Sequence, residues 1–267
     1  MLITFLGAGN LATSLAPALA ENGHKIVQVF SRTLESACIL VSKIEGGISS
    51  VCDLNGLFLE ADMFVYALPD DVIPVVAQQV AELLNRHRST VNIHHSIHCH
   101  TSGSVPIEAL SQYFGHSAVL YPSQTFKRSQ RIDLKHVPFF IEASDRQTEE
   151  AVVGLARNLS DEVYLADTNQ RKHLHIACVF ANNFTNCMYA IAKEELEKAG
   201  LPFKVLYPLI EQTARKVLAN DPHEIQTGPA SRGDMQTVAT HLSMLEGYHK
   251  EIYRVVTDEI RSWSLDN

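Results

Sequence analysis

The chain has 267 residues and a formal net charge of −8, and 46% of its residues are hydrophobic while 19% are charged. This balance is typical of a folded globular protein, so it excludes extended disorder. The acidic excess argues against nucleic acid or an anionic membrane as a partner. The five cysteines form no CxxC pair, which predicts reduced thiols and a cytoplasmic protein, with neither a disulfide scaffold nor a zinc site.

The first part of the chain alternates short apolar runs with helical patterns. We expect strands over 2–6, 25–30, 61–68, 90–97, 118–121, 139–142 and 163–166, and helices over 11–21, 33–45 and 72–84. Strands that alternate with helices in this way predict an α/β domain, with a parallel sheet covered on both faces.

After residue 168 the sequence shows helical periodicity without strand signals. Helices are expected over 169–199, 203–219, 234–246 and 248–262. The chain therefore divides into an α/β domain (1–166) and an all-α domain (167–267). A helical domain of about 100 residues often completes its core with a partner subunit, so a homodimer through this domain is expected.

A glycine-rich turn joins the first strand to the first helix. In the pattern Gly7-x-Gly9-x-x-Ala12, the first glycine permits the tight turn and the second lets a pyrophosphate approach the backbone. The helix that follows offers free N–H groups to phosphate. Because strand, turn and helix come in the required order, a Rossmann-like dinucleotide site is favoured over an ordinary tight turn. Its expected cofactor-binding residues are Gly7, Ala8, Gly9, Asn10 and Leu11.

The end of the second strand indicates which dinucleotide binds. Sites for NAD usually carry an acidic residue there, but this chain has Ser31, Arg32 and Thr33. A guanidinium flanked by hydroxyls suits a 2′-phosphate, so we predict NADP rather than NAD, with these three residues binding it. The alternative is a surface arginine paired with Glu35.

Four histidines lie within residues 92–100, at positions 94, 95, 98 and 100. A metal site would need His94, His98 and His100 on one side of a strand, but no carboxylate motif accompanies them, so no metal is assigned. His100 and Ser102 follow a strand at the sheet edge where ligands bind. We therefore expect His100 as a catalytic candidate and Ser102 as a cofactor contact. The alternative is a capped turn that opens a helix at Pro106, with Ser104 as its N-cap, and both interpretations can hold together.

Further candidates follow other strands. Leu68 and Pro69, which end the 61–68 strand, are assigned to the cofactor side. Gln124 follows the 118–121 strand and is a candidate substrate contact, with a Pro-led turn as the alternative.

The first long helix carries a polar row among apolar neighbours. Lys172, His175, Asn182 and Asn183 share one α-helical face, so a largely buried helix would need a ligand, or neighbouring loops, to satisfy them. His175 and Asn182 are the catalytic candidates, with His175 as the proton donor because histidine titrates near neutral pH. Asn183 is a candidate substrate contact.

A rigid loop over 227–234 opens a later helix, where Asp234 is the expected N-cap. Arg232 in this loop is placed to hold a substrate carboxylate bidentately, which favours a small carbonyl or imine acid as substrate.

Taken together, these residues resemble a bacterial family of NADP oxidoreductases that joins a Rossmann-like N-terminal domain to a helical domain of unknown function. The resemblance covers the whole chain. It rests on residues 7–10, 61–71, 100–103, 122–126, 175 with 182–183, and 227–234. The architecture is similar to pyrroline-5-carboxylate reductase, ketopantoate reductase and the β-hydroxyacid dehydrogenases, and the C-terminal domain is similar to that of 6-phosphogluconate dehydrogenase. These relatives imply NADP binding, a substrate between the domains, and dimers or larger assemblies.

Two departures keep the activities of these relatives unassigned. The catalytic lysine of the β-hydroxyacid dehydrogenases precedes an asparagine by four residues, whereas Lys172 precedes Asn182 by ten. The 227–234 loop also differs from the threonine-rich loop of the pyrroline-carboxylate enzymes. The sequence therefore predicts an NADP-dependent reductase with an unspecified small-molecule substrate. The alternative is a non-catalytic NADP-binding sensor.

Overall fold

The structure is a computed structural model that describes residues 1–87 and 95–263. Its contacts divide the chain into two compact units, Met1–Phe180 and Ala181–Asn267. The domain boundary expected after residue 166 falls just before helix α6 (Thr168–Cys178) and stays a prediction.

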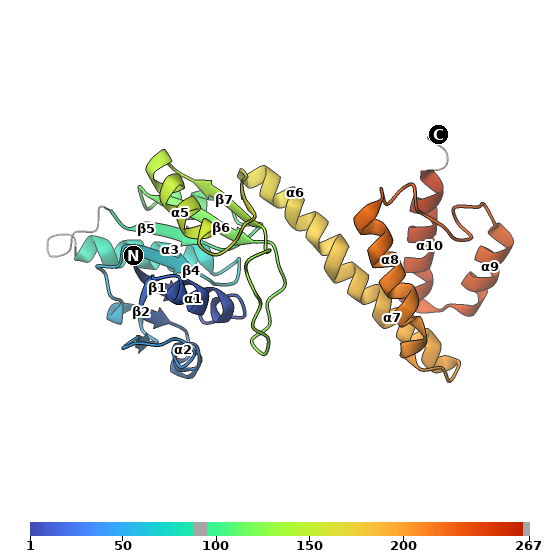
Figure 1. The fold of residues 1–267 in the computed structure, drawn as a ribbon, viewed down its shortest axis with the longest axis horizontal. Coiled ribbons are helices and arrows are strands. Elements are labelled where there is room, and N and C mark those ends of the chain that lie inside the picture. Colours follow the sequence, from blue (N-terminus) through green and yellow to red (C-terminus); the bar gives the residue numbers. More distant parts are fainter. Residues whose placement is uncertain (88–94, 264–267) are drawn as a thin grey trace. The chain divides into compact units, whose positions relative to one another are not determined.

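The first unit is built on one mixed sheet (Figure 1). Within the described residues the strand order is β3-β2-β1-β4-β5-β6-β7-β8. Neighbouring strands pair in parallel except β6 and β7, which are antiparallel. The strands are β1 (Leu2–Leu6), β2 (Lys25–Phe30), β3 (Ser49–Val51), β4 (Met63–Tyr66), β5 (Ile97–His100), β6 (Ser117–Pro122), β7 (Phe139–Ala143) and β8 (Val163–Leu165). The α/β fold is confirmed, and the carboxyl ends of β1, β4, β5 and β6 share one edge.

Helices cover both faces of this sheet, as expected. One apolar cluster contains residues of α1 (Ala12–Glu21), α2 (Leu34–Val41) and α5 (Arg146–Arg157). A second cluster contains residues of α3 (Ile73–Arg86) and α4 (Glu108–Ser111). The segment between β6 and β7 adds Phe126, Leu134 and Val137 to the first cluster.

The placement of β5 corrects the expectation of a strand over 90–97. The strand covers Ile97–His100, and residues 88–94 lie outside the described part of the chain. The error has a physical reason, because two histidines are buried inside this strand. His98 stacks on Phe114 with ring centroids 3.5 Å apart, and its Nδ1 lies 2.9 Å from the Tyr66 hydroxyl. Strand β3 and helix α5 were not predicted.

The helix expected over 169–199 is present but irregular. It consists of α6, a π-helical segment (Val179–Phe184) and α7 (Thr185–Lys198). The α-helical spacing that groups His175 with Asn182 assumes 3.6 residues per turn, and the π segment departs from it. The expectation that this helix is largely buried is wrong, since Phe180 is 62% exposed and Ile176 and Phe184 are also exposed.

The second unit continues with a short 3-10 turn (Phe203–Leu206) and three helices, α8 (Tyr207–Ala219), α9 (Met235–Met244) and α10 (Gly247–Ser262). As expected, Asp234 caps α9 by accepting the Thr237 N–H at 3.0 Å. Among described residues 181–263, only Val238 and Thr257 are buried. This unit therefore has almost no core within one chain.

Within the described residues, none of the helices has both the length and the apolar character needed to cross a membrane. All five cysteines are free thiols. The cytoplasmic location inferred from them stays a prediction.

Candidate functional site

The turn after β1 has the geometry that a dinucleotide-binding turn requires. Gly7 has φ +112°, and a Cβ built on it would lie 2.2 Å from the Ala67 carbonyl oxygen at the end of β4. Its N–H donates to the Phe30 carbonyl at the end of β2, at 2.8 Å. Glycine is therefore required here, because any side chain would separate β1 from β4.

The start of helix α1 leaves room for an anion. Leu11 is the N-cap residue and provides no side-chain cap, and the first turn holds no acidic residue. The first N–H groups of a helix lack partners inside the helix and carry partial positive charge. The glycine cradle and this uncapped helix start fit a dinucleotide pyrophosphate, which Gly9, Asn10 and Leu11 would hold through their backbone N–H groups.

The segment after β2 carries the residues expected to select the 2′-phosphate. The side chain of Arg32 is exposed, as is that of Thr33. The Thr33 hydroxyl also caps α2, where it accepts the Ser36 N–H at 3.4 Å. Ser31 is half-buried and donates its N–H to the Val51 carbonyl. Arg32 thus remains available to a ligand at the carboxyl end of β2, next to β1.

His100 occupies the end of β5 and is fully buried. Its Nδ1 accepts the Ser102 N–H at 3.3 Å. Burial, together with the nearby Arg171 charge, lowers the pKa of His100 to about 3. A ring that stays neutral at ordinary pH and is shielded from solvent is a poor proton donor. This burial argues against the catalytic role expected for His100 and gives it a part in shaping the loop that follows.

That loop is held from inside by the Ser102 hydroxyl. Its oxygen accepts the N–H groups of Ser104 and Val105 at 3.1 and 3.0 Å. The Ser104 hydroxyl donates to the carboxylate of Asp70, which follows β4. Ser104 was expected to cap the next helix, but α4 follows Ile107 without a side-chain cap, and the Ser104 hydroxyl instead bonds the loop that contains Leu68 and Pro69.

The carbonyl groups of the same loop are bound by Arg171 on α6, which is fully buried. One terminal nitrogen donates to the carbonyls of Ser102, Gly103 and Val105 at 3.2, 3.3 and 3.0 Å. The other terminal nitrogen and Nε donate to Glu142 on β7. Arg171 therefore joins the loop after β5, strand β7 and helix α6 in one hydrogen-bonded network.

Tyr121 and His175 form a second link between the sheet edge and α6. The Tyr121 hydroxyl lies 3.4 Å from His175 Nδ1, and the rings meet edge to face. One turn along the helix, the Cys178 sulfur lies 3.1 Å from the Ser123 hydroxyl. Gln124, by contrast, is exposed, and its side-chain oxygen accepts the N–H of its neighbour Thr125. The structure thus brings His175, but not Gln124, into a polar cluster beside β6.

Of the histidines considered for a metal, His98 and His100 have other partners in the structure. His98 is buried between aromatic rings, and burial lowers its pKa to about 3. His94 lies outside the described residues. A search of the described part of the chain finds no group of three His, Cys, Asp or Glu residues that could hold a metal ion.

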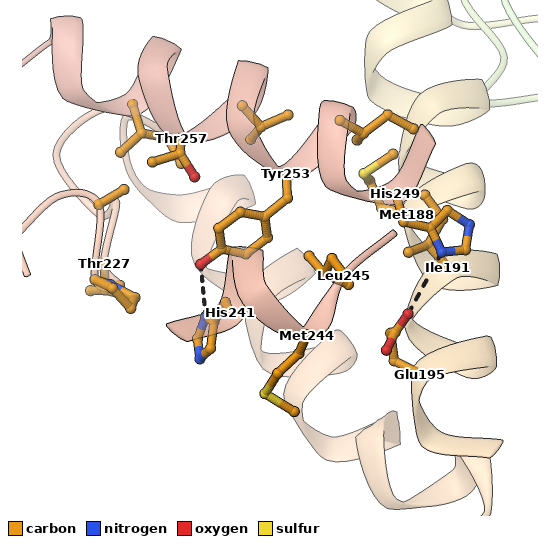
Figure 2. A pocket seen from close by; sticks show the side chains of 16 residues that line it. Met188, Ile191, Glu195, Thr227, His241, Met244, Leu245, His249, Tyr253 and Thr257 are labelled. Carbon is orange, nitrogen blue, oxygen red and sulfur yellow. Dashed lines mark hydrogen bonds and ion pairs between the residues drawn. The ribbon is translucent and has the colours of Figure 1, made fainter. Parts of the chain in front are cut away.

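The second unit contains Asn182 and Asn183, within the π-helical segment, and Arg232, which is exposed before α9. It also contains a cavity of about 570 Å³ between α7, the 227–230 loop, α9 and α10 (Figure 2). Apolar side chains dominate its lining, and among the polar ones His241 Nδ1 contacts the Tyr253 hydroxyl at 2.7 Å. None of the predicted site residues lines this cavity.

Comparisons with known proteins place the chain in a family. Residues 2–93 match a family model described as NADP oxidoreductase, coenzyme F420-dependent, and residues 137–260 match a domain of unknown function (DUF2520). A Bacteroides fragilis protein of known structure, assigned as an NADP oxidoreductase, is 40% identical, with 98% of each chain covered and a TM-score of 0.87. The chain belongs to this NADP oxidoreductase family. NADP, the cofactor predicted from the sequence, is confirmed.

More distant similarities show less about this NADP oxidoreductase. A pyrroline-5-carboxylate reductase from Coxiella burnetii is 16% identical with a TM-score of 0.56, covers 99% of this chain and 97% of its own, and shows the shared fold alone. A Latilactobacillus sakei glycerol-3-phosphate dehydrogenase is 30% identical over 92 residues, which are 31% of this chain and 27% of that enzyme. The chain thus spans less than a third of the length of the curated relatives it matches.

Sequence reasoning missed three residues that shape the site of this NADP oxidoreductase. Arg171 lies beside Lys172 and His173 and reads as part of a charged helix surface. Glu142 reads as the solvent end of a weak strand. Tyr121 stood in a recognised segment but was not singled out. Each acquires its role through a partner more than 25 positions away, which spacing along the chain does not reveal.

Proposed function

We propose that this NADP oxidoreductase is a reductase of a small carbonyl or imine acid. The observation that carries the proposal is a half-buried histidine, His175, held by hydrogen bonding at the sheet edge that also bears the glycine turn. When bound, NADPH supplies the hydride, and the chain supplies orientation and a proton. His175 is the proton source in this proposal, because histidine exchanges protons near neutral pH.

The chain's other residues have separate parts in the proposal. The turn residues and Arg32 bind the pyrophosphate and 2′-phosphate, and Ser102, Leu68 and Pro69 face the cofactor. Asn182 as a catalytic group, and Gln124, Asn183 and Arg232 as substrate contacts, stay predictions, with Arg232 reserved for the substrate carboxylate. His100 is left out of the proton-transfer set because it is buried and neutral.

A turnover screen tests this function. NADPH oxidation is followed with 2-keto acids and cyclic imino acids as acceptors. For the activity named in the curated relatives, the reduction of NADP by glycerol 3-phosphate is followed. We expect the wild type to reduce one acid substrate. The turnover rate on that substrate should fall by about 100-fold or more in His175→Gln. His173→Gln is the matched control, because His173 is exposed on the same helix. Tight NADPH binding without turnover on any acceptor would contradict the reductase and support the sensor.

We also propose that a second copy of the chain covers the apolar surface of the second unit. Leu218 and Tyr248 are each 87% exposed, and Met244 on the cavity wall is 72% exposed. A unit of this size in which two of the described residues are buried cannot offset its chain entropy alone. The proposal thus retains the homodimer predicted from the sequence; the similarity to the C-terminal domain of 6-phosphogluconate dehydrogenase likewise stays a prediction.

Sedimentation over a range of protein concentrations tests the dimer. We expect twice the mass of one chain at micromolar concentration, and dissociation in Met244→Glu, which places a charge on the apolar surface. Val75→Glu is the control, because Val75 is an exposed apolar residue on α3 in the first unit. A wild-type protein that stays monomeric throughout would contradict the proposal.

A further inference from the structure

The ring of Tyr121 is held in one place by its neighbours. Tyr121 is the penultimate residue of β6, and a Cβ built on Gly103 would lie 2.7 Å from its Cζ atom. The Tyr121 ring therefore lies directly against the backbone of the loop after β5. Phe140, on β7, lies on another side of the ring, with centroids 6.4 Å apart. Gly103 is needed here because a side chain would push the ring out of this position.

The loop beneath the ring is itself fixed. The carbonyls of Ser102, Gly103 and Val105 accept hydrogen bonds from the buried Arg171, and the Ser102 hydroxyl binds two N–H groups of the loop. The ring of Tyr121 therefore packs against a loop whose carbonyl and N–H groups are both held by hydrogen bonds. A catalytic hydroxyl needs this kind of support, since small displacements of a reacting group reduce its rate strongly.

The hydroxyl end of Tyr121 points to groups that keep it protonated. Burial, followed by the nearby Cys178, raises the pKa of Tyr121 to about 12; a hydrogen bond with Ser123 acts in the opposite direction, and Asp70 adds a smaller upward contribution. A phenol in this state is neutral at ordinary pH and carries a proton that it can give to a stronger base. His175 Nδ1, 3.4 Å away, is in position to return a proton to the oxygen.

We propose that Tyr121 is a catalytic residue that delivers the proton to the substrate, and that His175 acts behind it by resupplying that proton. This inference rests on the reductase function proposed above. The hydride adds to the carbonyl carbon, and the C=O π electron pair moves to oxygen, which takes the proton of the Tyr121 hydroxyl. The resulting phenolate takes the Nδ1 proton of a protonated His175 ring, and the neutral imidazole that remains takes up a proton from solvent, so the reduction consumes one hydride and one proton.

The identity of the donor narrows the substrate class. A carbonyl oxygen becomes strongly basic only as the hydride adds, so a phenol can protonate it at that moment. An imine nitrogen must carry its proton before the hydride arrives, and a phenol that holds its own proton tightly is unsuited to that task. A phenol as the proton donor therefore favours a carbonyl acid, reduced to a hydroxy acid, over an imine.

Three variants of the full-length protein test the role of the hydroxyl. Tyr121→Phe removes the oxygen and keeps the ring. Gly103→Ala keeps the oxygen and displaces the ring. The double variant combines them, and Tyr164→Phe is the control, because Tyr164 stacks on the same Phe140 ring but bonds to Glu162. Each is measured for kcat with a carbonyl acid, for NADPH affinity, and for the nitrogen-15 shift of His175 Nδ1.

We expect Tyr121→Phe to lower kcat by about 100-fold or more, as for loss of a general acid, with NADPH affinity within twofold of wild type. Its His175 Nδ1 signal should shift, because the hydroxyl partner is gone. Gly103→Ala should lower kcat about tenfold or more, and the double variant should be no slower than Tyr121→Phe, since both changes act on one hydroxyl. Tyr164→Phe should match wild type in every measurement.

The outcomes separate this inference from the function on which it rests. A wild-type protein that binds NADPH but reduces no acceptor overturns the reductase, and the role of Tyr121 with it. A wild type that is active while Tyr121→Phe stays within threefold of it overturns only the role of Tyr121. An unchanged His175 signal in Tyr121→Phe, or losses that multiply in the double variant, would overturn the Tyr121–His175 relay.

Discussion

Arg171 and Glu142 form an ion pair that fastens helix α6 to strand β7. The Arg171 side chain is 0% exposed and that of Glu142 17%, and the Thr168 hydroxyl donates to the same carboxylate at 2.9 Å. With the three loop carbonyls, all five N–H groups of the guanidinium have acceptors. Removing a buried charge whose hydrogen-bond donors all have acceptors should cost the protein much of its stability.

Replacing Arg171 by Met should destabilise the protein by about 3–5 kcal/mol, because Glu142 and the loop carbonyls lose their donor while staying buried. Urea unfolding followed by circular dichroism measures the change. Arg146→Ala is the control, since its ion pair with Glu150 is exposed and should be worth less than about 1 kcal/mol. Equal losses in the two variants would show that the buried network contributes nothing special.

Gly7→Ala should abolish tight NADPH binding and destabilise the first unit. The added Cβ would lie 2.2 Å from the Ala67 carbonyl, so the β1 turn and the end of β4 must move apart. Gly154→Ala is the matched control, because Gly154 lies in helix α5 with open space around it. Alanine there should raise stability by up to about 1 kcal/mol. An unchanged NADPH affinity in Gly7→Ala would contradict the proposed cofactor site.

Asp145 should make stability depend on acid pH. Burial acts to raise its pKa, but hydrogen bonds from Thr148, His116 and Ser144 outweigh it and hold the pKa well below the ordinary value of 3.8. A carboxyl whose pKa is lowered by folding stabilises the protein above that ordinary value and loses the contribution as pH falls below about 4. The free energy of unfolding should therefore fall less between pH 5 and pH 3 in Asp145→Asn than in wild type. Parallel pH curves would refute this role.

The part of the fold that follows from local pattern was predictable. The β1–α1–β2 unit has apolar runs of the right length and a glycine turn between them, and these features act over few residues. The position of β5 was not predictable, because His98 and His100 read as polar although one stacks between aromatic rings and the other shapes a loop. The burial of His98 depends on Phe64 and Phe114, which lie elsewhere in the sequence.

In the candidate site too, features set by neighbouring residues were predictable and features set by distant contacts were not. The cofactor turn and the Arg32 segment are each a short run of consecutive residues. The sequence alone therefore predicted NADP. The pairing of Tyr121 with His175 joins residues 54 positions apart, and the pairing of Glu142 with Arg171 joins residues 29 apart. Such contacts arise only when the sheet and α6 have packed. The exposure of apolar residues on the long helix likewise has no signal in periodicity, since a buried helix and an exposed one can have the same pattern.

Recognition of the cofactor by Arg32 is tested most directly by a titration. Nicotinamide fluorescence is followed as the wild type, Arg32→Ala and the control Arg146→Ala bind NADPH and NADH. We expect the wild type to prefer NADPH, and Arg32→Ala to lose about tenfold or more in NADPH affinity while NADH affinity stays unchanged, because in the proposed site the guanidinium binds the 2′-phosphate, which NADH lacks. Equal affinity of Arg32→Ala and wild type for NADPH would contradict the account.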